Sequence, residues 1–289
     1  AWHPNGAYIV FSANSVNGRD VNQPSIHLIN GADSKSDLVV YDIENNAFYT
    51  DSSVFNDRYW ETYPTWAPDG KTIYFCRANA LDAKDHEDLS KIQYNLMKIE
   101  FDIKTHEWSK PKTVIDAISL NRSIAFPRLS PDGRYLMFTL YDFGVFSIFR
   151  NVSDLAIYDI REQRSYMLNP INTPETESYH TWSSNGRWVV YSSKYPDGEC
   201  GRPYIAAFDP KTGYASKGFV LPQRDPGFYK RFILSFNIPE LYHTRSTLTL
   251  RQLLKATGEE SLPASIKEGP DSKTYHHKKE KNTSLWQAG

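Results

Sequence analysis

Runs of β-branched and aromatic residues, separated by tight turns, recur along the first 221 residues of the chain. The best-defined stretch runs from Glu61 to Phe75 and has the turn sequence Pro68-Asp69-Gly70 near its middle. Proline fixes φ and glycine accepts a positive φ, so this sequence is typical of a β-turn. The residues from Thr72 to Phe75 suit a half-buried strand. The pattern therefore predicts a strand, a turn and a second strand over residues 61–75.

The same unit occurs four times, with Asn-Gly or Asp-Gly turns at residues 5–6, 69–70, 132–133 and 185–186. In each unit a third apolar segment ends in an acidic residue, and a fourth short β-like segment follows. Repeated four-stranded units without helical periodicity favour a β-propeller, and an antiparallel sandwich is the alternative. We therefore expect an all-β propeller of four-stranded antiparallel blades starting near residues 1, 61, 124 and 177. The four visible repeats are expected to belong to a ring of six or seven blades.

The domain organisation follows from where this pattern stops. Residues 1–243 are predicted to form the propeller, with residues 222–243 as an aromatic extension packed on the last blade. Residues 244–289 are polar and rich in Ser, Gly, Pro and Lys, so we expect a disordered tail. Within it, residues 249–257 have the composition of a short helix.

Composition limits the possible partners. The net charge of −1 gives no field suited to nucleic acid or to an anionic membrane. No apolar run approaches the roughly 20 residues needed to span a bilayer. The chain begins within a repeat, so we expect a truncated N-terminus whose missing part carried an export signal or a lipid anchor. Cys76 and Cys200 lie in different repeats, and two buried thiols are expected in preference to a disulfide.

The turn region carries a family resemblance. The segments Pro64-Thr-Trp66-Ala-Pro68-Asp69-Gly70-Lys71 and Pro127-Arg-Leu129-Ser130-Pro131-Asp132-Gly133-Arg134 resemble the propeller repeats of TolB and its relatives. The fourth copy departs from that pattern, because His180 replaces the proline. The resemblance implies the fold, whereas such propellers serve as partner-binding modules, peptidase gates and lyase scaffolds alike. The wider sequence is similar to uncharacterised TolB-like proteins of Bacteroidetes cell envelopes, which implies export to the periplasm or outer membrane.

The candidate site lies just before the innermost strand of each blade. Glu61 and Tyr63 match Glu177 and Tyr179, and Arg122 precedes the corresponding strand of the third repeat. These side chains are expected near the mouth of the channel, where the acids could hold a cation or a basic partner segment. Alternatively, the aromatic rings pack between blades and the acids are simply solvated.

Two further features bear on the same face. Asp37 and Asp154 begin the third strands of repeats one and three, so we expect them to make this face acidic together with the two glutamates. The longest insertions, within residues 11–38 and 75–96, leave the blades at the same structural point, which suggests a binding surface.

Few residues indicate catalysis. A channel-facing His180 could be a base or a metal ligand, and a structural histidine is the simpler interpretation. His86 lies in an insertion, and His276-His277 lies in the tail. The sequence contains no Gly-x-Ser-x-Gly nucleophile motif, phosphate loop or Cys-x-x-Cys pair, so no cofactor or metal is expected.

These observations predict a non-catalytic propeller that binds a protein or peptide of the cell envelope through Glu61, Tyr63, Arg122, Glu177, Tyr179 and His180. Such recognition would use shape and hydrogen bonds. The alternative is a propeller enzyme of the glycan-lyase or hydrolase type, in which His180 acts with channel carboxylates, with or without a metal. A structural module tethered by its tail is a third possibility.

Overall fold

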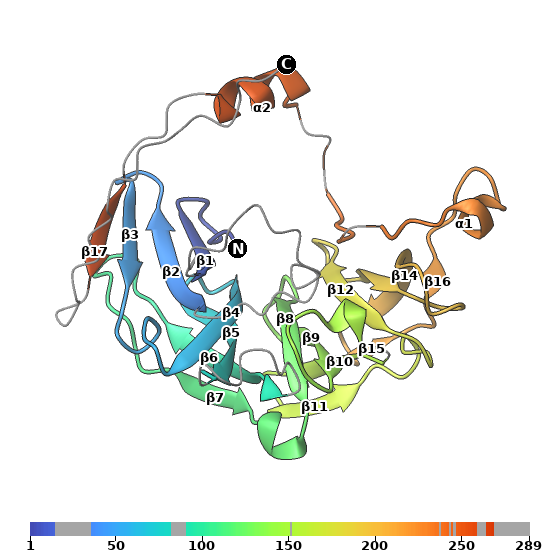
Figure 1. Cartoon of the computed structure of the whole chain (residues 1–289), viewed down its shortest axis with the longest axis horizontal. Helices are drawn as coiled ribbons and strands as arrows, with labels where there is room; N and C mark the ends of the chain where they lie inside the picture. The colour runs from blue at the N-terminus through green and yellow to red at the C-terminus, as the bar shows by residue number, and fades with distance from the viewer. Residues whose placement is uncertain are drawn as a thin grey trace.

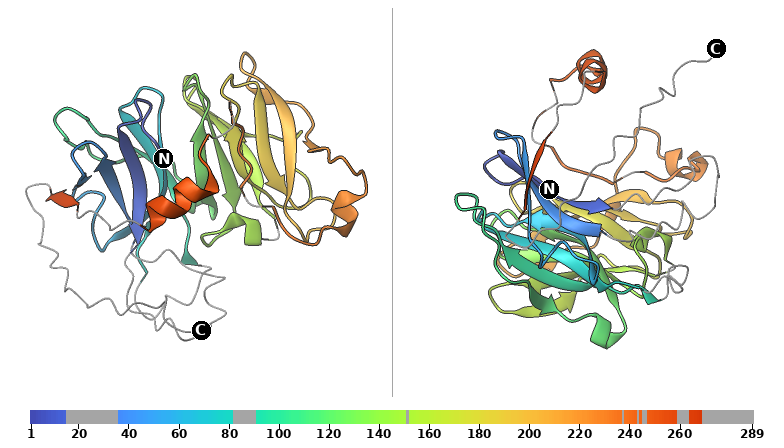
Figure 2. Two further views of the ribbon diagram at one scale, coloured as in Figure 1. Left: turned by 90° about the horizontal axis from the view of Figure 1, so that it is seen from above. Right: turned by 60° about the vertical axis from the view of Figure 1, so that its left-hand side comes forward.

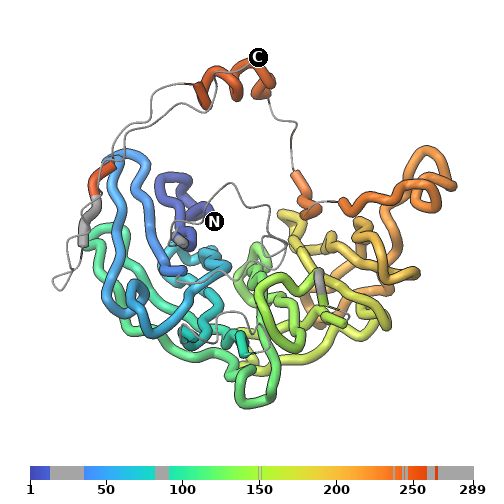
Figure 3. Tube along the Cα trace, in the orientation of Figure 1, coloured from blue at the N-terminus to red at the C-terminus, as the bar shows by residue number. Residues whose placement is uncertain are grey.

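Four antiparallel sheets stand side by side around a common centre, and the chain visits them in order (Figure 1). The computed structural model describes residues 1–14, 36–81, 91–150, 152–236, 238–242, 244, 247–258 and 264–268. The predicted insertions at 15–35 and 82–90, with His86, and most of the tail, with His276-His277, lie outside the described residues. Figure 3 shows the same path as a tube, from blue through green to orange.

We name the sheets blades 1 to 4. Within a blade, strands adjacent in sequence pair antiparallel, as predicted, except that the fifth strand of blade 4 pairs with the third. Their strands are β1 (Tyr8–Asn14), β2 (Ser36–Asp42) and β3 (Ala47–Thr50) in blade 1; β4 (Tyr59–Trp66), β5 (Thr72–Asn79), β6 (Asn95–Glu100) and β7 (Lys112–Ile115) in blade 2; β8 (Ser123–Leu129), β9 (Tyr135–Tyr141), β10 (Asp154–Asp159) and β11 (Arg164–Met167) in blade 3; β12 (Glu177–Trp182), β13 (Trp188–Ser193), β14 (Arg202–Asp209), β15 (Tyr214–Ala215) and β16 (Phe219–Val220) in blade 4.

The turns form where the Asn-Gly and Asp-Gly pairs predict them. Gly70 and Gly133 have φ angles of 66° and 72°, a region that glycine enters without steric cost. In the second blade Asp69 accepts hydrogen bonds from the backbone amides of Lys71 and Thr72, both at 2.8 Å. Each turn therefore ends the inner strand of its blade at a fixed position.

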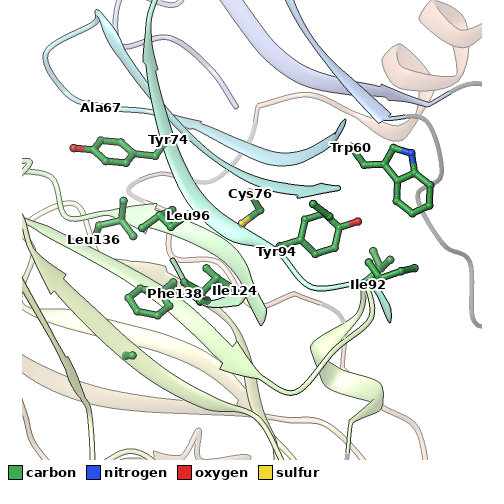
Figure 4. Packing of buried hydrophobic residues seen from close by; sticks show 14 residues of the cluster. Trp60, Ala67, Tyr74, Cys76, Ile92, Tyr94, Leu96, Ile124, Leu136 and Phe138 are labelled. Carbon is green, nitrogen blue, oxygen red and sulfur yellow. The ribbon is translucent and has the colours of Figure 1, made fainter. Parts of the chain in front are cut away.

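The hydrophobic core lies between the blades. Side chains alternate along each strand, so one set faces the preceding blade and the other set faces the next. Between blades 2 and 3, for example, Tyr74, Cys76 and Leu96 pack with Leu136 and Phe138 (Figure 4). Equivalent clusters join blade 1 to blade 2 and blade 3 to blade 4. Both faces of an inner blade are therefore buried.

Each complete inner strand carries a β-bulge at the same position. The register shifts between Thr62 and Thr65 in β4, and at the equivalent positions in β8 and β12. The aromatic residue inside each bulge has a left-handed backbone, with φ of 53° at Tyr63, 53° at Phe126 and 49° at Tyr179. Such a conformation is uncommon for a non-glycine residue, so the surrounding sheet must hold it in place.

Beyond blade 4 the described residues form short elements. These are α1 (Phe228–Arg231), α2 (Leu250–Thr257) and β17 (Ser265–Glu268), and short 3₁₀ turns lie at Ile118–Leu120 and Ser147–Phe149. Thr249 and Gln252 form a capping box at the start of α2, where the sequence predicts a helix. The segment from 265 to 268, expected to be disordered, instead pairs parallel with β3. In Figure 2, α2 stands away from the blades, and no described helix is long and apolar enough to cross a membrane.

Candidate functional site

Glu61 lies inside the protein, at the junction of blades 1 and 2. It belongs to β4 and pairs in register with Arg77 of β5, and its side chain is fully buried, with 0% exposure. Arg77 Nε is 2.9 Å from Glu61 Oε1, but the two groups are not aligned as a hydrogen bond. The guanidinium donates instead to the Ser53 carbonyl oxygen at 2.6 Å and lies 4.6 Å from the centre of the Tyr59 ring. The charge of Arg77 is therefore shared among three neighbours.

Asp37 faces this pair from blade 1. It is the second residue of β2, is half-buried, and accepts a hydrogen bond from the Asn56 backbone amide at 3.0 Å. Burial raises the pKa of Asp37 to about 7, although the Asn56 amide opposes this change. Asp37, Glu61 and Arg77 will be called the Asp37 cluster.

Burial also dominates the protonation of Glu61. It raises the pKa of Glu61 to about 8, Arg77 opposes the increase, and the nearby Asp37 adds to it. A buried carboxyl group favours its neutral form unless an opposite charge is well aligned with it. Asp37 and Glu61, from neighbouring blades, are therefore two carboxyl groups whose pKa values burial raises, and Glu61 lies 2.9 Å from the Arg77 guanidinium.

The equivalent glutamate of blade 4 has different surroundings. Glu177 pairs in register with Ser193, at the position that Arg77 has in blade 2. Its carboxylate accepts hydrogen bonds from the Ser193 hydroxyl (2.7 Å), the Thr173 hydroxyl (2.7 Å) and the Thr173 amide (2.9 Å). Burial raises the pKa of Glu177, these hydrogen bonds oppose the change, and Asp154 adds to it. Glu177 is thus fixed by neutral donors.

Arg122 lies near this second pair. It is exposed, and its positive charge opposes the increase that burial causes in the pKa of Asp154. The two aspartates also match in their electrostatic effect. Asp37 raises the pKa of Glu61, and Asp154 raises the pKa of Glu177, so each acts on the glutamate of the following blade. The two glutamates do not make this face acidic as expected, because both side chains are buried.

The three bulge aromatics lie in a row across blades 2, 3 and 4. The ring centres of Tyr63 and Phe126 are 4.3 Å apart, and those of Phe126 and Tyr179 are 4.8 Å apart. Tyr63 also donates its hydroxyl hydrogen to the Val145 carbonyl oxygen at 2.7 Å. All three are partly exposed. The rings therefore pack against one another between blades, as the alternative interpretation expects. A role for them in partner binding stays a prediction.

His180 is a buried residue between blades 3 and 4. It is 1% exposed, and its Nε2 atom lies 3.0 Å from the Met137 carbonyl oxygen, to which it can donate. Burial lowers the pKa of His180 to about 3, so the ring is neutral at physiological pH. The groups that act on His180 are the backbone of Met137 and of Phe126 and the charge of Arg128, and neither Glu61 nor Glu177 is among them. Among the described residues, no group of three or more His, Cys, Asp and Glu is arranged to hold a metal ion.

Comparison with known proteins gives structural neighbours but no family. No family model matches the chain, and no curated protein matches it. Similar solved structures include a prolyl endopeptidase (16% identity, TM-score 0.49, 78% of this chain and 28% of that one) and a puromycin hydrolase (14%, 0.44, 74% and 29%). Another is the β-propeller domain of the Trilobed protease from Pyrococcus furiosus (15%, 0.35, 59% and 46%). The chain spans less than half of each of these solved chains.

The fold prediction is confirmed and the main functional prediction is corrected. The repeated sheets of four or five strands, which stand around a common centre, give this chain an all-β propeller fold. The expectation of a non-catalytic propeller that binds a partner through Glu61, Glu177 and His180 is contradicted by their positions in the structure. Glu61, Glu177 and His180 are expected on an exposed mouth, but all three are buried and cannot contact a partner there.

Proposed function

We propose that this chain is the propeller of a hydrolase and that the Asp37 cluster is its acid–base site. The observation that carries the proposal is geometric: the Arg77 guanidinium lies 2.9 Å from the buried Glu61 carboxyl group, and Asp37 of the neighbouring blade acts on the same carboxyl group. Burial raises the pKa of both carboxyl groups toward neutral pH. Perturbed titratable groups that gather in one place are typical of catalytic sites. The hydrolase part of the alternative sequence prediction is retained, and His180 is replaced by Asp37 as its base.

The exposure of the three residues divides their roles. Asp37 is half-buried and can reach a substrate, whereas the side chain of Glu61 is fully buried. Asp37 would accept a proton from a water molecule as the water oxygen attacks an acyl carbon. It would return that proton to the leaving amine as the acyl bond breaks. A base with a pKa near the working pH is the most effective for such transfers.

Glu61 and Arg77 would support this proton transfer without contacting the attacking water. A protonated Glu61 adds no second negative charge beside Asp37, so Asp37 can ionise near neutral pH. The Arg77 guanidinium, whose side chain is 13% exposed, can stabilise negative charge that develops on the substrate oxygen. Glu61 is therefore a positioning residue, and Asp37 is the residue expected to contact the substrate.

The neighbouring structures suggest which bonds to test first. A prolyl endopeptidase and a puromycin hydrolase are among them, so we take peptide and aminoacyl amides as the substrate class. The segments Trp66-Ala-Pro68-Asp69-Gly70 and Leu129-Ser130-Pro131-Asp132-Gly133 support assignment to the TolB-like propellers, and location in a bacterial envelope is part of the same proposal. A peptide from that compartment would then be a substrate.

The test is hydrolysis of a panel of chromogenic peptide and aminoacyl amides by the wild-type chain and two variants. Asp37→Asn removes the base and is expected to lower kcat/KM by about 10² to 10⁴. Asp154→Asn, at the matching position of blade 3, is the control and should retain activity. Circular dichroism confirms that both variants fold. Absence of turnover by the wild-type chain, or an equal loss in both variants, would contradict the proposal.

A further inference from the structure

The inner strands of blades 2, 3 and 4 each place one aromatic ring at the same strained position. Tyr63, Phe126 and Tyr179 all have a positive φ, and their ring centres lie 4.3 Å and 4.8 Å apart in a row. A left-handed backbone is costly for an aromatic residue, and such strain gathers at ligand sites. The three side chains are partly exposed on the innermost strands β4, β8 and β12 (Figure 1). The row is therefore a surface on which a ligand can pack.

A residue beside this row departs from the repeat. Thr65 in β4 and Thr181 in β12 stand two residues after the bulge aromatic, and Arg128 occupies that position in β8. Threonine suffices for the strand in two blades, so the fold does not require an arginine there. The backbone of Arg128 is held by the next blade, because the Trp182 indole Nε1 donates to its carbonyl oxygen at 3.0 Å. An arginine is thus fixed in place next to the rings.

The Arg128 guanidinium forms no hydrogen bond or ion pair with any residue in the part of the chain that the structure describes. The side chain is partly buried, and this burial lowers its pKa. The charge of Glu240 opposes that change, but no ion pair joins the two groups, and Glu240 accepts a hydrogen bond from the Tyr242 hydroxyl. A partly buried charge without a counter-ion is unfavourable, so this guanidinium has the properties of an anion-binding group.

We propose that Arg128 and the row of Tyr63, Phe126 and Tyr179 bind the C-terminal carboxylate and the last apolar side chain of a peptide. The planar guanidinium matches a carboxylate, which it can hold through two parallel hydrogen bonds. The partly exposed rings give an apolar side chain a surface to pack against. One guanidinium balances the single charge of a carboxylate, whereas a phosphate group carries nearly two charges at neutral pH.

This ligand fits the function proposed above. Tyr63 lies two residues from Glu61 on β4, so the row begins beside the Asp37 cluster and continues onto blades 3 and 4. A peptide held by its C-terminal end at Arg128 would have its preceding residues nearer to that cluster. The choice of a peptide as the ligand rests on the proposed function, whereas the unpaired guanidinium and the row of rings do not.

Isothermal titration calorimetry with N-acetyl-Ala-Ala-Phe and with its C-terminal amide tests the proposal, because the two probes differ in the carboxylate alone. The wild-type chain should bind the acid about 10- to 100-fold more tightly than the amide, as expected for hydrogen bonds to a charged group. Arg128→Thr introduces the residue that blades 2 and 4 have at this position, so it should fold, and it should bind both probes equally. Arg161→Thr is the control, since it removes an arginine with a 76% exposed side chain on an outer turn of blade 3, and it should keep the wild-type preference.

Phe126→Ala tests the contribution of the rings. It should weaken the binding of both probes by the same factor, about 3- to 10-fold, because it removes a packing surface and leaves the charge in place. The proposal would be overturned by a wild type that fails to bind the acid or binds both probes equally. It would also be overturned by a preference for the acid that survives in Arg128→Thr, or by unchanged affinities in Phe126→Ala. These are binding measurements, so they fail independently of the turnover assay that tests the hydrolase.

Discussion

Replacement of Glu61 by glutamine should remove a large part of the dependence of stability on pH. In the unfolded chain Glu61 ionises near its ordinary pKa of 4.5, whereas in the folded chain burial holds its pKa at about 8. Between these values the unfolded chain releases a proton that the folded chain keeps. The free energy of unfolding of the wild type therefore falls as the pH rises through this window.

The size of this effect follows from the two pKa values. Each unit of difference corresponds to about 1.4 kcal/mol, so the contribution of Glu61 to folding falls by about 4 kcal/mol between pH 5 and pH 8. Glutamine has nearly the same shape and cannot ionise. The stability of Glu61→Gln should consequently exceed that of the wild type by an amount that grows with pH over this range. The residual pH dependence of Asp37 is present in both proteins.

Urea denaturation followed by tryptophan fluorescence, at pH 5, 6, 7 and 8, measures this difference. Glu100→Gln is the control, because Glu100 is exposed and Lys71, 2.8 Å away, lowers its pKa. The stabilisation by the Glu100 carboxylate is lost only in acid, below the tested pH range. The free energy of unfolding of Glu100→Gln should therefore depend on pH in the same way as that of the wild type. If the Glu61→Gln curve also ran parallel to the wild type, Arg77 would be holding Glu61 ionised throughout. The argument that burial outweighs the misaligned ion pair would then be refuted.

Two other substitutions test the structural assignments. His180→Ala should destabilise the protein by about 2 to 3 kcal/mol in urea denaturation, because it removes a buried side chain hydrogen-bonded to Met137. The pH profile of amide hydrolysis should stay unchanged in this variant. Gly133→Ala should cost about 1 to 2 kcal/mol, since alanine is strained at a φ of 72°, whereas an unchanged denaturation midpoint would mean that the turn relaxes freely.

The strands and turns were accessible from sequence because they depend on local chemistry. The Asp-Gly and Asn-Gly pairs specify a left-handed residue, and the β-branched and aromatic runs beside them specify half-buried strands. The repetition of both then defines blades, since one such unit cannot bury both of its faces alone. Pairing between β17 and β3 has no comparable local signal, and the composition of the tail favours disorder instead.

Arg77 escaped prediction for a geometric reason. Counting outward from the turn of blade 2, where Trp66 pairs with Ile73, places Glu61 opposite Ala78. The bulge between Thr62 and Thr65 shifts the register by one residue, so the true partner is Arg77. A slip of one residue moves a side chain to the other face of a strand. The left-handed tyrosine that marks the bulge has no sequence signature of its own.

The burial of Glu61 and Glu177 could not be predicted either, because glutamate is usually exposed to solvent and the sequence before an inner strand gives no sign of burial. What separates the two glutamates is the residue across the hairpin. Ser193 gives Glu177 a hydroxyl donor, and Thr173 supplies two more donors, which leaves that carboxylate fully hydrogen-bonded. Arg77 gives Glu61 a charge at 2.9 Å without hydrogen-bond alignment.

The two blades therefore use one backbone position in different ways. In blade 4 the bulge places a carboxylate where neutral donors fix it, which suits a structural role. In blade 2 the same bulge places a carboxyl group beside a misaligned guanidinium and a second acid, which keeps its protonation variable. The propeller repeat supplies the position, and the residue across the hairpin determines whether that position is structural or reactive. The reactivity that we propose for the Asp37 cluster would thus depend on side chains that the repeat pattern does not constrain.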